Sequence, residues 1–457
     1  MKATRTGALL ITIALATANS PGQSPSLADR CPPFFAVFQA GGGEPQAMDS
    51  TTGKVTLLKD INPGPAGSSP KDGVVADGEV YFWAEDRDTG LRIWKTDGAV
   101  ESTFPLELDY PTLRGRGNGR LCGAERGFII TSNSQIARYS SDSGKLTGVF
   151  DPKLRFAEIV ENSDGILART QGTGYKKPSW IYEIPRGNSQ PIEVAESMVR
   201  LDEIRQAVKL GQQWLCVKPG HLATLHDATS TGYAPIIKGI SAAGGGIVLG
   251  KKLIFAGQEL FNRPDGVAVN KYGVELFETD GTAAGTKLLK DILDTPGDSV
   301  GSRPSQITRC GKKVIFTIQV SGVPNQNRLW ESDGTTGGTK LLAELPTGSS
   351  IRNITSVGEG AEFTVSTLGR GKDLWWTNGT AEGTRRIMEG GAEEGGLQKF
   401  ADGVVFFGSA NGKRGIWWSD GKSDMPQFIG AIEGMPYSLL RNGELFALLP
   451  GRRGGKP

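Results

Sequence analysis

The sequence predicts an all-β fold, namely a β-propeller of about nine four-stranded, blade-sized repeats, with seven or eight blades as alternatives. Three observations predict this fold. Glycine makes up 65 of the 457 residues, about twice its usual share, which suits many short strands joined by tight turns. A short Asp-Gly phrase recurs at nearly constant spacing, and a second, weaker hairpin pattern precedes that phrase in each period.

The recurring phrase is clearest in three copies, "ELFETDGTAAGTKLLKDI" from Glu275, "RLWESDGTTGGTKLLAEL" from Arg328 and "DLWWTNGTAEGTRRIMEG" from Asp373. Its turn, or the equivalent position, occurs nine times at a mean spacing of about 46 residues, and a period of 40 to 50 residues with internal strands is typical of propeller blades. The nine positions are Asp49, Asp97, Asp142, Arg186, Asp227, Asp280, Asp333, Asn378 and Asp420.

Each period also contains a second hairpin. Examples are "VVADGEVYFWAED" from Val74 and "ITRCGKKVIFTIQ" from Ile307, in which a polar, glycine-containing turn precedes a β-branched and aromatic run. Two hairpins give four strands per period. Because a lone four-stranded sheet cannot cover both of its faces, neighbouring units must stack on one another, and the repetition predicts a closed or stacked array.

The two ends of the repeat array predict how the ring closes. The first unit begins with the candidate strand "PFFAVFQA" from Pro33 and lacks an innermost strand, whereas "YSLLRNGELFALLPG" from Tyr437 is a half unit without its turn hairpin. Joining these N- and C-terminal strands into one blade would remove exposed sheet edges. One strand is surplus in this scheme, either Phe34–Phe38 or Glu444–Leu449.

The N-terminal residues predict export. Lys2 and Arg5 precede an apolar run from Gly7 to Ala16, which has the length of a signal-peptide core and is short for a membrane span. Ala16-Thr17-Ala18 matches a small-x-small cleavage pattern. We expect a secreted protein, extracellular or periplasmic, without a membrane anchor. The expected segments are a signal peptide and short leader over 1–28, a single propeller domain over 29–451 and a disordered tail over 452–457.

The Asp-Gly phrase is interpreted as a structural turn. Aspartate can accept hydrogen bonds from backbone amides just ahead of it, and glycine tolerates a positive φ. The hydroxyls of Thr335 and Thr339 can bond across the loop. A calcium site is the alternative, but calcium loops need several oxygen side chains in quick succession, and each copy offers one acid. The predicted turn residues are Asp97, Gly98, Asp280, Gly281, Asp333, Gly334, Asn378, Gly379, Asp420 and Gly421.

The pattern of these copies resembles the ELWxxDGT repeat family of exported bacterial proteins, sometimes described as hyalin-like. The segment "TLLKDINPGPAGSSP" from Thr56 is similar to the linker between that family's repeats. The resemblance is close at Glu275, Arg328 and Asp373. It implies export and a β-propeller-type architecture. It implies no established catalytic activity, so no functional residue is carried over from it.

The four cysteines lie far apart in the sequence. Cys31, Cys122, Cys216 and Cys310 are each separated by more than 90 residues. They are interpreted either as small buried side chains in strands or, because export permits disulfides, as one or two long-range disulfides. A zinc site would need closer clustering.

Recognisable catalytic and cofactor motifs are missing from the sequence. It has no GxSxG, no HExxH and no phosphate-cradling loop, and Ala242–Gly246 is interpreted as a flexible turn between units. His221 and His226 lie five residues apart, and therefore on opposite faces of a strand. The net charge is +2 without a basic stripe, which argues against nucleic-acid binding. We therefore expect no metal, cofactor or catalytic residue.

One connection is longer than its counterparts, the segment between Gln258 and Glu275. Loops on one face of a rigid scaffold often carry binding sites, so this segment is a candidate ligand-binding loop, with simple loop drift as the alternative. Its charged, amide and aromatic side chains are Arg263, Asp265, Asn270, Lys271 and Tyr272.

These observations predict an exported, non-enzymatic propeller repeat protein that binds an extracellular protein or polysaccharide through loops on one face. A structural component of the cell surface or matrix is the first alternative. The second is a carbohydrate-active hydrolase or lyase, which would need two carboxylates about 5 to 10 Å apart. Acids near the predicted innermost strands that could supply them are Asp72, Glu158 and Asp202.

Overall fold

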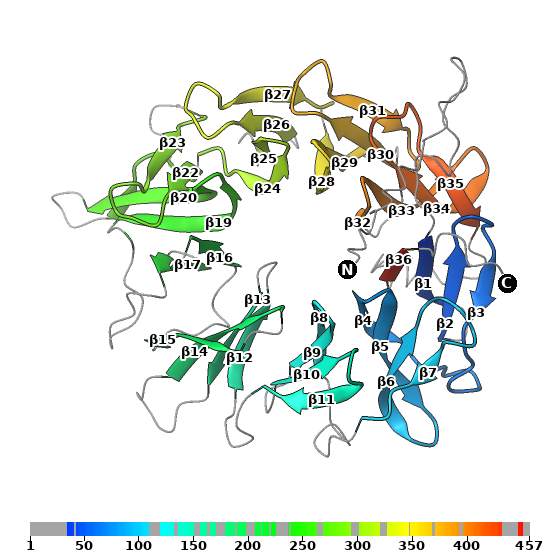
Figure 1. The fold of residues 1–457 in the computed structure, drawn as a ribbon. Coiled ribbons are helices and arrows are strands. Elements are labelled where there is room, and N and C mark those ends of the chain that lie inside the picture. Colours follow the sequence, from blue (N-terminus) through cyan, green and yellow to red (C-terminus); the bar gives the residue numbers. More distant parts are fainter. Residues whose placement is uncertain are drawn as a thin grey trace, which may run out of the picture.

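The described part of the chain is entirely β-structure. No α-helix occurs in it, and its strands form nine antiparallel sheets around a central opening (Figure 1). The all-β prediction is therefore confirmed. Within the same ranges, no helix long and apolar enough to cross a bilayer is found. The computed structural model describes residues 34–450 except 41–42, 109–118, 132–135, 150–155, 162–164, 171–178, 188–189, 198–205, 212, 219–220, 225–235, 237–238, 263–267, 294–300, 320–326, 347, 368–370, 393–395 and 432–446.

In eight of the nine sheets the strands along the main path follow one another in chain order. Figure 1 shows that the first strands β4, β8, β24 and β28 lie nearest the opening in their sheets. The first four sheets are β4 (Lys71–Ala76), β5 (Glu79–Asp86), β6 (Gly90–Thr96) and β7 (Phe104–Pro105); β8 (Arg120–Ala124), β9 (Gly127–Thr131), β10 (Ile136–Ser140) and β11 (Lys145–Gly148); β12 (Phe156–Glu161), β13 (Gly165–Thr170), β14 (Ser179–Pro185) and β15 (Ile192–Ser197); and β16 (Gln206–Leu210), β17 (Gln213–Lys218) and β18 (His221–Thr224).

The next four sheets contain the clearest copies of the repeat. They are β19 (Ile240–Leu249), β20 (Lys252–Asn262), β22 (Glu275–Thr279) and β23 (Lys287–Lys290), with β21 (Ala268–Asn270) paired to the end of β20; β24 (Ser305–Cys310), β25 (Lys313–Gln319), β26 (Asn327–Ser332) and β27 (Lys340–Glu344); β28 (Ser349–Val357), β29 (Gly360–Thr367), β30 (Gly371–Thr377) and β31 (Arg385–Met388); and β32 (Gln398–Phe400), β33 (Gly403–Ala410), β34 (Lys413–Ser419) and β35 (Gln427–Ala431).

The ninth sheet joins the two ends of the chain. It contains β36 (Ala447–Pro450), β1 (Phe34–Ala40), β2 (Glu44–Asp49) and β3 (Val55–Leu57), in that order. The C-terminal strand β36 pairs antiparallel with β1, so that each covers an edge of the other. Both candidate terminal segments contribute a strand to this sheet, while residues 432–446 lie outside the described ranges.

The Asp-Gly phrase forms the turn between the third and fourth strands. Asp280 Oδ1 accepts hydrogen bonds from the Thr282 backbone N–H at 2.9 Å and from the Thr282 hydroxyl at 2.7 Å. These bonds hold the pKa of Asp280 below its ordinary value. Gly281 has a φ of 90°, where a side chain would be strained. Across the turn the hydroxyls of Thr279 and Thr286 lie 2.6 Å apart.

The same geometry recurs at the other predicted turns. Asp333 and Asn378 each accept the backbone N–H and the hydroxyl of the threonine two residues later, and Asp97 and Asp420 also accept the amide two residues ahead. The hydroxyl of Thr339 contacts that of Ser332. The glycines of these turns all have positive φ, namely Gly98, Gly281, Gly334, Gly379 and Gly421.

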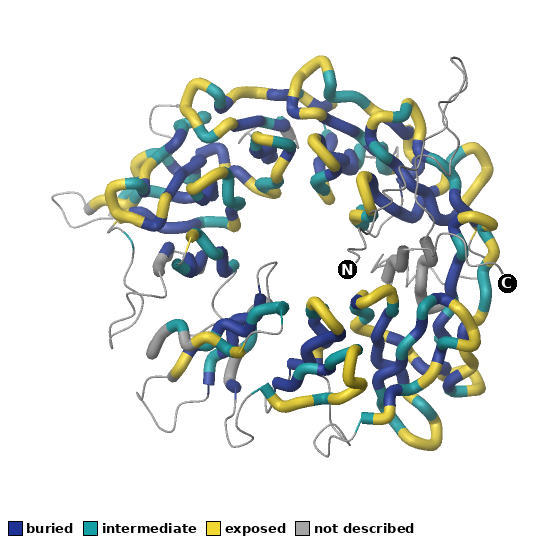
Figure 2. The backbone as a smooth tube through the Cα atoms, in the orientation of Figure 1, coloured by how far each residue is buried: buried dark blue, intermediate teal, exposed yellow. Residues whose placement is uncertain are grey.

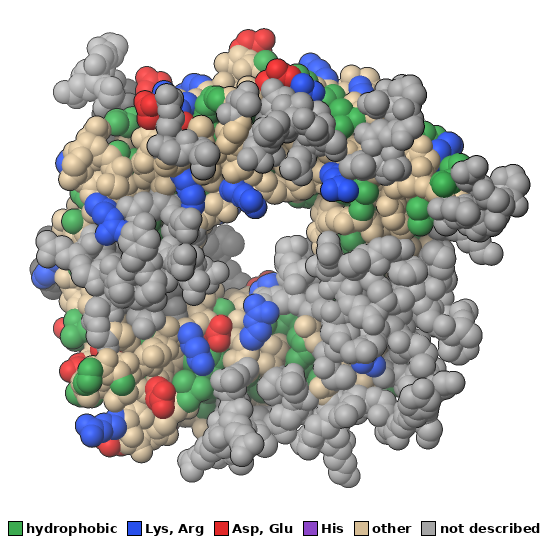
Figure 3. All heavy atoms as spheres, turned by 180° about the vertical axis from the view of Figure 1, so that it is seen from behind, with side chains coloured by type: hydrophobic (Ala, Val, Ile, Leu, Met, Phe, Trp, Pro, Cys, Tyr) green, Lys and Arg blue, Asp and Glu red, His purple; other side chains and the backbone are tan. Residues whose placement is uncertain are grey.

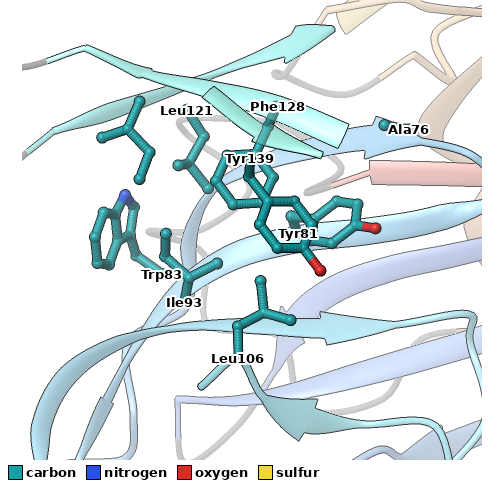
Figure 4. Packing of buried hydrophobic residues seen from close by; sticks show 9 residues of the cluster. Ala76, Tyr81, Trp83, Ile93, Leu106, Leu121, Phe128 and Tyr139 are labelled. Carbon is teal, nitrogen blue, oxygen red and sulfur yellow. The ribbon is translucent and has the colours of Figure 1, made fainter. Parts of the chain in front are cut away.

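Hydrophobic side chains fill the space between adjacent sheets, so the buried residues follow the centres of the strands (Figure 2). Between the β4–β7 and β8–β11 sheets, Tyr81, Phe128 and Tyr139 pack with ring centroids 4.8–5.6 Å apart (Figure 4). Burying one such side chain contributes about 1.5–3 kcal/mol. Around them lie Ala76, Trp83, Ile93, Leu106 and Leu121.

The three described cysteines are buried, and no disulfide joins them to one another. Burial raises the pKa of Cys216 to about 12 and that of Cys310 to about 11, so these thiols stay protonated at neutral pH. For Cys122, Cys216 and Cys310 the structure therefore shows the buried side chains that the sequence allowed, and not disulfides. Cys31 lies outside the described residues.

Candidate functional site

A cavity of about 630 Å³ lies where three consecutive innermost strands meet. Gln206 reaches it from β16, Gly244 and Gly245 from β19, and Gln306 from β24, so the cavity borders the central opening. We call it the Arg303 pocket. Its lining comprises Gln206, Ala243, Gly244, Gly245, Gly246, Ala256, Val274, Arg303, Pro304, Ser305, Gln306 and Ile307.

The glycine run of β19 widens the pocket. The pairing of β19 with β20 jumps from Ala242 opposite Gly257 to Gly246 opposite Phe255, so three residues of β19 face Ala256 alone. Such a bulge leaves backbone groups unpaired in the ladder. A Cβ atom at Gly246 would lie 2.4 Å from the Ile254 carbonyl oxygen, which excludes other residues there. The prediction of a flexible turn was wrong, because this run lies inside a strand.

Gln206 connects the glycine bulge to the preceding sheet. Its Nε2 donates to the Gly246 carbonyl at 2.8 Å, and its Oε1 accepts the Gly246 backbone N–H, also at 2.8 Å. Both polar ends of the amide are therefore used. This pair of bonds holds one wall of the pocket in place.

A buried glutamate holds the opposite wall. Glu275 is fully buried and accepts hydrogen bonds from the Ser302 N–H at 2.7 Å, the Ser302 hydroxyl at 2.5 Å and the Ile292 N–H at 3.1 Å. Burial raises the pKa of Glu275, and these hydrogen bonds oppose the rise. The Arg303 backbone N–H donates to the Val274 carbonyl at 2.9 Å. The backbone around Arg303 is thus fixed from two sides.

The linker before β4 is held by the same glutamate–serine hydrogen bond, but it has Ser69 at the position that Arg303 occupies before β24. Glu44 accepts the hydroxyl of Ser68 at 2.6 Å, and Ser69 adopts a φ of 47°, close to the 48° of Arg303. Ser69 and Arg303 therefore occupy equivalent places in two connections. A non-glycine residue at this φ is uncommon. The repeat provides the backbone geometry, and arginine is the feature particular to the pocket.

Arg303 is the charged group of the pocket. Its side chain is exposed to solvent, and no carboxylate among the described residues forms an ion pair with it. An arginine presents five N–H donors in a planar fork that matches carboxylate, phosphate and sulfate oxygens. Polar lining around it comes from Ser305 and from the backbone of the glycine bulge. The arrangement suits an acidic group.

The predicted ligand-binding loop lies elsewhere. Asn270 ends β21 and donates to Gln258 Oε1 at 3.1 Å. The Lys271 ammonium lies 3.8 Å from Glu259 and 4.7 Å from the ring centroid of Tyr272. The structure thus brings the last three predicted residues onto one hairpin. Arg263 and Asp265 lie outside the described residues.

Among the other candidate acids and histidines, only Asp72 has a described side chain, so the structure does not test whether these residues converge. Asp72 lies on β4 and His221 begins β18, whereas His226 and Asp202 fall outside the described residues. In the described ranges, no group of three or more His, Cys, Asp or Glu side chains is placed to hold a metal ion. Sequence reasoning missed the Arg303 pocket because its residues belong to three different periods. The only local signal was arginine in "SRPSQ" where the equivalent linker has "SSPKD".

Comparisons with known proteins show likeness at the level of fold alone. No protein-family model and no curated protein matches the chain. A structure from a study of two prolyl endopeptidases matches with a TM-score of 0.37 at 12% identity, over 77% of this chain and 54% of that chain. The β-propeller domain of the Trilobed protease from Pyrococcus furiosus gives 0.33 at 12%, over 70% and 97%. An oligogalacturonate lyase in complex with manganese gives 0.35 at 12%, over 89% and 98%.

These matches contradict the prediction of a non-enzymatic binding protein. The similar structures are those of peptidases and a lyase, at TM-scores of 0.33–0.38 and 9–13% identity. The prediction relied on the lack of catalytic motifs in the sequence, and a fold of this kind hosts many functions without a shared motif. The chain spans about half the length of the prolyl endopeptidase that it matches, and none of these activities is transferred to it.

Proposed function

We propose that the chain is an exported, nine-bladed β-propeller that binds a small acidic ligand in the Arg303 pocket. The nine sheets around the opening and the pairing of β36 with β1 support the architecture. The recurring Asp-Gly phrase is the sequence basis of the proposed resemblance to the ELWxxDGT repeat family. Arg303 supports the ligand class, since a carboxylate, phosphate or sulfate group would satisfy its exposed guanidinium.

The observation that carries this proposal is the backbone support of Arg303. Glu275 and Val274 hold it at a φ of 48° beside the glycine bulge, so the side chain is presented to the cavity by a rigid frame. Because the backbone at Arg303 is fixed before the ligand arrives, only the side chain has to be ordered on binding, which lowers the entropic cost. The equivalent Ser69 shows that the repeat does not need arginine for folding.

The test is calorimetric titration of the folded protein with inorganic phosphate, sulfate and acetate at low ionic strength. We expect at least one of the three anions to bind at one site per chain. Arg303→Ser, which copies the residue of the equivalent linker, should weaken binding at least tenfold, because a charge-assisted hydrogen bond contributes about 1.5–3 kcal/mol. Arg303→Lys should give an intermediate affinity.

The matched control is Lys145→Ala, which removes an exposed cation from the outer strand β11 and should leave the affinity unchanged. Equal binding by the wild type and Arg303→Ser would refute the proposal. A thermal melt of each variant separates lost binding from lost folding.

Export and the macromolecular partner remain proposals of their own. Residues 1–28 carry the signal-peptide pattern, and cell fractionation with N-terminal sequencing of the mature protein would test it. An extracellular protein or polysaccharide remains the predicted partner class, with no nucleic acid and no membrane anchor. The hairpin of Asn270, Lys271 and Tyr272 remains a candidate contact for that partner.

A further inference from the structure

Three cations occupy the same level of the repeat around the opening. Lys71 of β4, Arg120 of β8 and Arg352 of β28 each pair with the fifth residue of the following strand, namely Trp83, Thr131 and Thr364. Because the register is equivalent, the three side chains leave their innermost strands at the same height. We call Lys71, Arg120 and Arg352 the inner cation layer.

The Arg303 pocket lies at this same level. Gln206 and Ser305 pair with Val217 and Thr317, which are again the fifth residues of their strands. A hydrogen bond places Arg352, one of the three layer cations, beside the pocket. Gln306 donates to the Ile351 carbonyl at 2.8 Å, and Arg352 is the next residue. Arg352 is therefore the layer cation next to the pocket, whereas Lys71 and Arg120 lie on β4 and β8, across the opening (Figure 1).

Among the described side chains, the inner cation layer has one acidic neighbour in register, Asp72 on β4. All three cations are exposed, and none forms an ion pair with a described carboxylate. Asp72 follows Lys71 directly, and the backbone register puts Glu158 at the layer position on β12, although its side chain lies outside the described ones. Figure 3 shows Lys and Arg side chains gathered around the rim of the opening, although the net charge of the whole chain is only +2.

We propose that the opening takes a linear oligoanion, a small flexible molecule that carries several phosphate, sulfate or carboxylate groups. This inference rests on the proposed function of the Arg303 pocket, which holds one acidic group while Arg352 contacts a second, and Lys71 and Arg120 add to the positive potential of the opening. Converging cations with low-dielectric walls concentrate the field on such a ligand. Nucleic acid is disfavoured because the exposed large aromatics of the described chain, Phe104, Trp180 and Phe261, lie off the innermost strands, where bases would need to stack.

The test compares inorganic phosphate with inorganic tripolyphosphate by calorimetry. Linked acidic groups should bind together, so tripolyphosphate should bind at least about tenfold more tightly than phosphate, with a steeper salt dependence. The triple variant Lys71→Gln, Arg120→Gln and Arg352→Gln should remove most of that advantage and weaken phosphate binding by a much smaller factor than tripolyphosphate binding. Lys145→Ala is the control and should change neither.

The outcomes separate the two proposals. If phosphate binds but tripolyphosphate binds no more tightly, the pocket stands and the oligoanion inference fails. If neither binds to folded protein, the oligoanion inference fails, and the pocket proposal fails with it unless sulfate or acetate binds. An equal loss in Lys145→Ala, or a single-stranded oligonucleotide that displaces tripolyphosphate at equal charge concentration, would also overturn the inference.

Discussion

Glu362 is a buried carboxyl where the repeat otherwise places an apolar side chain. It is the third residue of β29, and the third residues of β20, β25 and β33 are Ile254, Ile315 and Val405. Glu362 is fully buried, and neither of its carboxylate oxygens has a hydrogen-bond partner of normal geometry among the described residues. Such a charge is costly to bury without a partner.

Two neighbouring sheets show how a glutamate is accommodated at this interface. In these sheets the glutamate lies on the third strand, β22 or β26, instead of the second, and it forms ion pairs with two lysines. Glu278 lies 2.9 Å from Lys252 and 3.6 Å from Lys287, and Glu331 lies 2.6 Å from Lys313 and 3.4 Å from Lys340. In the β28–β31 sheet the two positions are exchanged in kind. Trp376 on the third strand occupies the place of Glu278 and Glu331, and the acid is Glu362, which lies opposite it on the second strand.

Burial therefore raises the pKa of Glu362 to about 8, with the charge of Asp420 adding to the rise and the Ser419 hydroxyl opposing it. The folded state holds a proton up to about pH 8, whereas the unfolded state releases it near the ordinary value of 4.5. The contribution of Glu362 to the free energy of unfolding is thus highest below pH 4.5 and falls as pH rises toward 8. The two pKa values differ by about 3.5, and each unit corresponds to about 1.4 kcal/mol, so the loss is about 5 kcal/mol.

The perturbation that tests this is Glu362→Val, which copies Val405, alongside the near-isosteric Glu362→Gln. Both remove the titration. Urea unfolding, followed by tryptophan fluorescence between pH 4 and 9, should show the stability of the variants relative to wild type rising by about 5 kcal/mol across that range. Glu362→Val should be the more stable variant, because glutamine leaves a buried amide unpaired.

Glu331→Gln is the contrasting control. It removes one partner of an ion pair whose lysines are partly exposed, so it should destabilise the fold by about 1–2 kcal/mol. Parallel pH profiles for the wild type and Glu362→Val would refute the reasoning. So would a Glu362 carboxyl that titrates near pH 4.5 in the folded protein.

Three further outcomes follow from the geometry. Gly421→Ala should lower the free energy of unfolding in urea by about 3 kcal/mol or more, because φ is 68° and the new Cβ would lie 1.9 Å from Trp376 Cε3. Gly334→Ala, whose new Cβ would have its nearest neighbour at 3.4 Å, should lower it by about 1 kcal/mol. Equal losses in the two variants would contradict this reasoning. Glu275→Gln should lower phosphate affinity as well as stability, the latter by about 1–3 kcal/mol, and unchanged calorimetric affinity would remove its positioning role. Deleting Ala447–Pro450 exposes an edge of β1, so melting temperature should fall and size-exclusion chromatography should show association; a monomer of unchanged stability would argue otherwise.

The sequence was sufficient for the repeat and its turns, because their determinants are local. Asp280 and Gly281 act within one hairpin, and the same bonds recur wherever the phrase recurs. The glycine run was misread because glycine marks both flexible turns and sites of close backbone approach, as at Gly246. These two uses look alike in a single sequence.

The pocket could not be found in that way, because Gln206, the glycine bulge and Arg303 are distant in sequence and meet only through the order of the sheets. The same limit applies to Glu362. The sequence around Glu362 has the residue pattern of an ordinary strand. Only the three-dimensional structure shows that Glu362 is fully buried and has no lysine partner among the described residues.

The pairing of β1 with β36 also sets the order of events during synthesis. Phe34 meets Pro450 in this ladder, so the contact closes a loop of almost the entire chain. Contacts of such long range form late and slowly. A nascent chain on the ribosome can build its early sheets one after another, yet its first strand waits, with one edge open, until the last residues emerge.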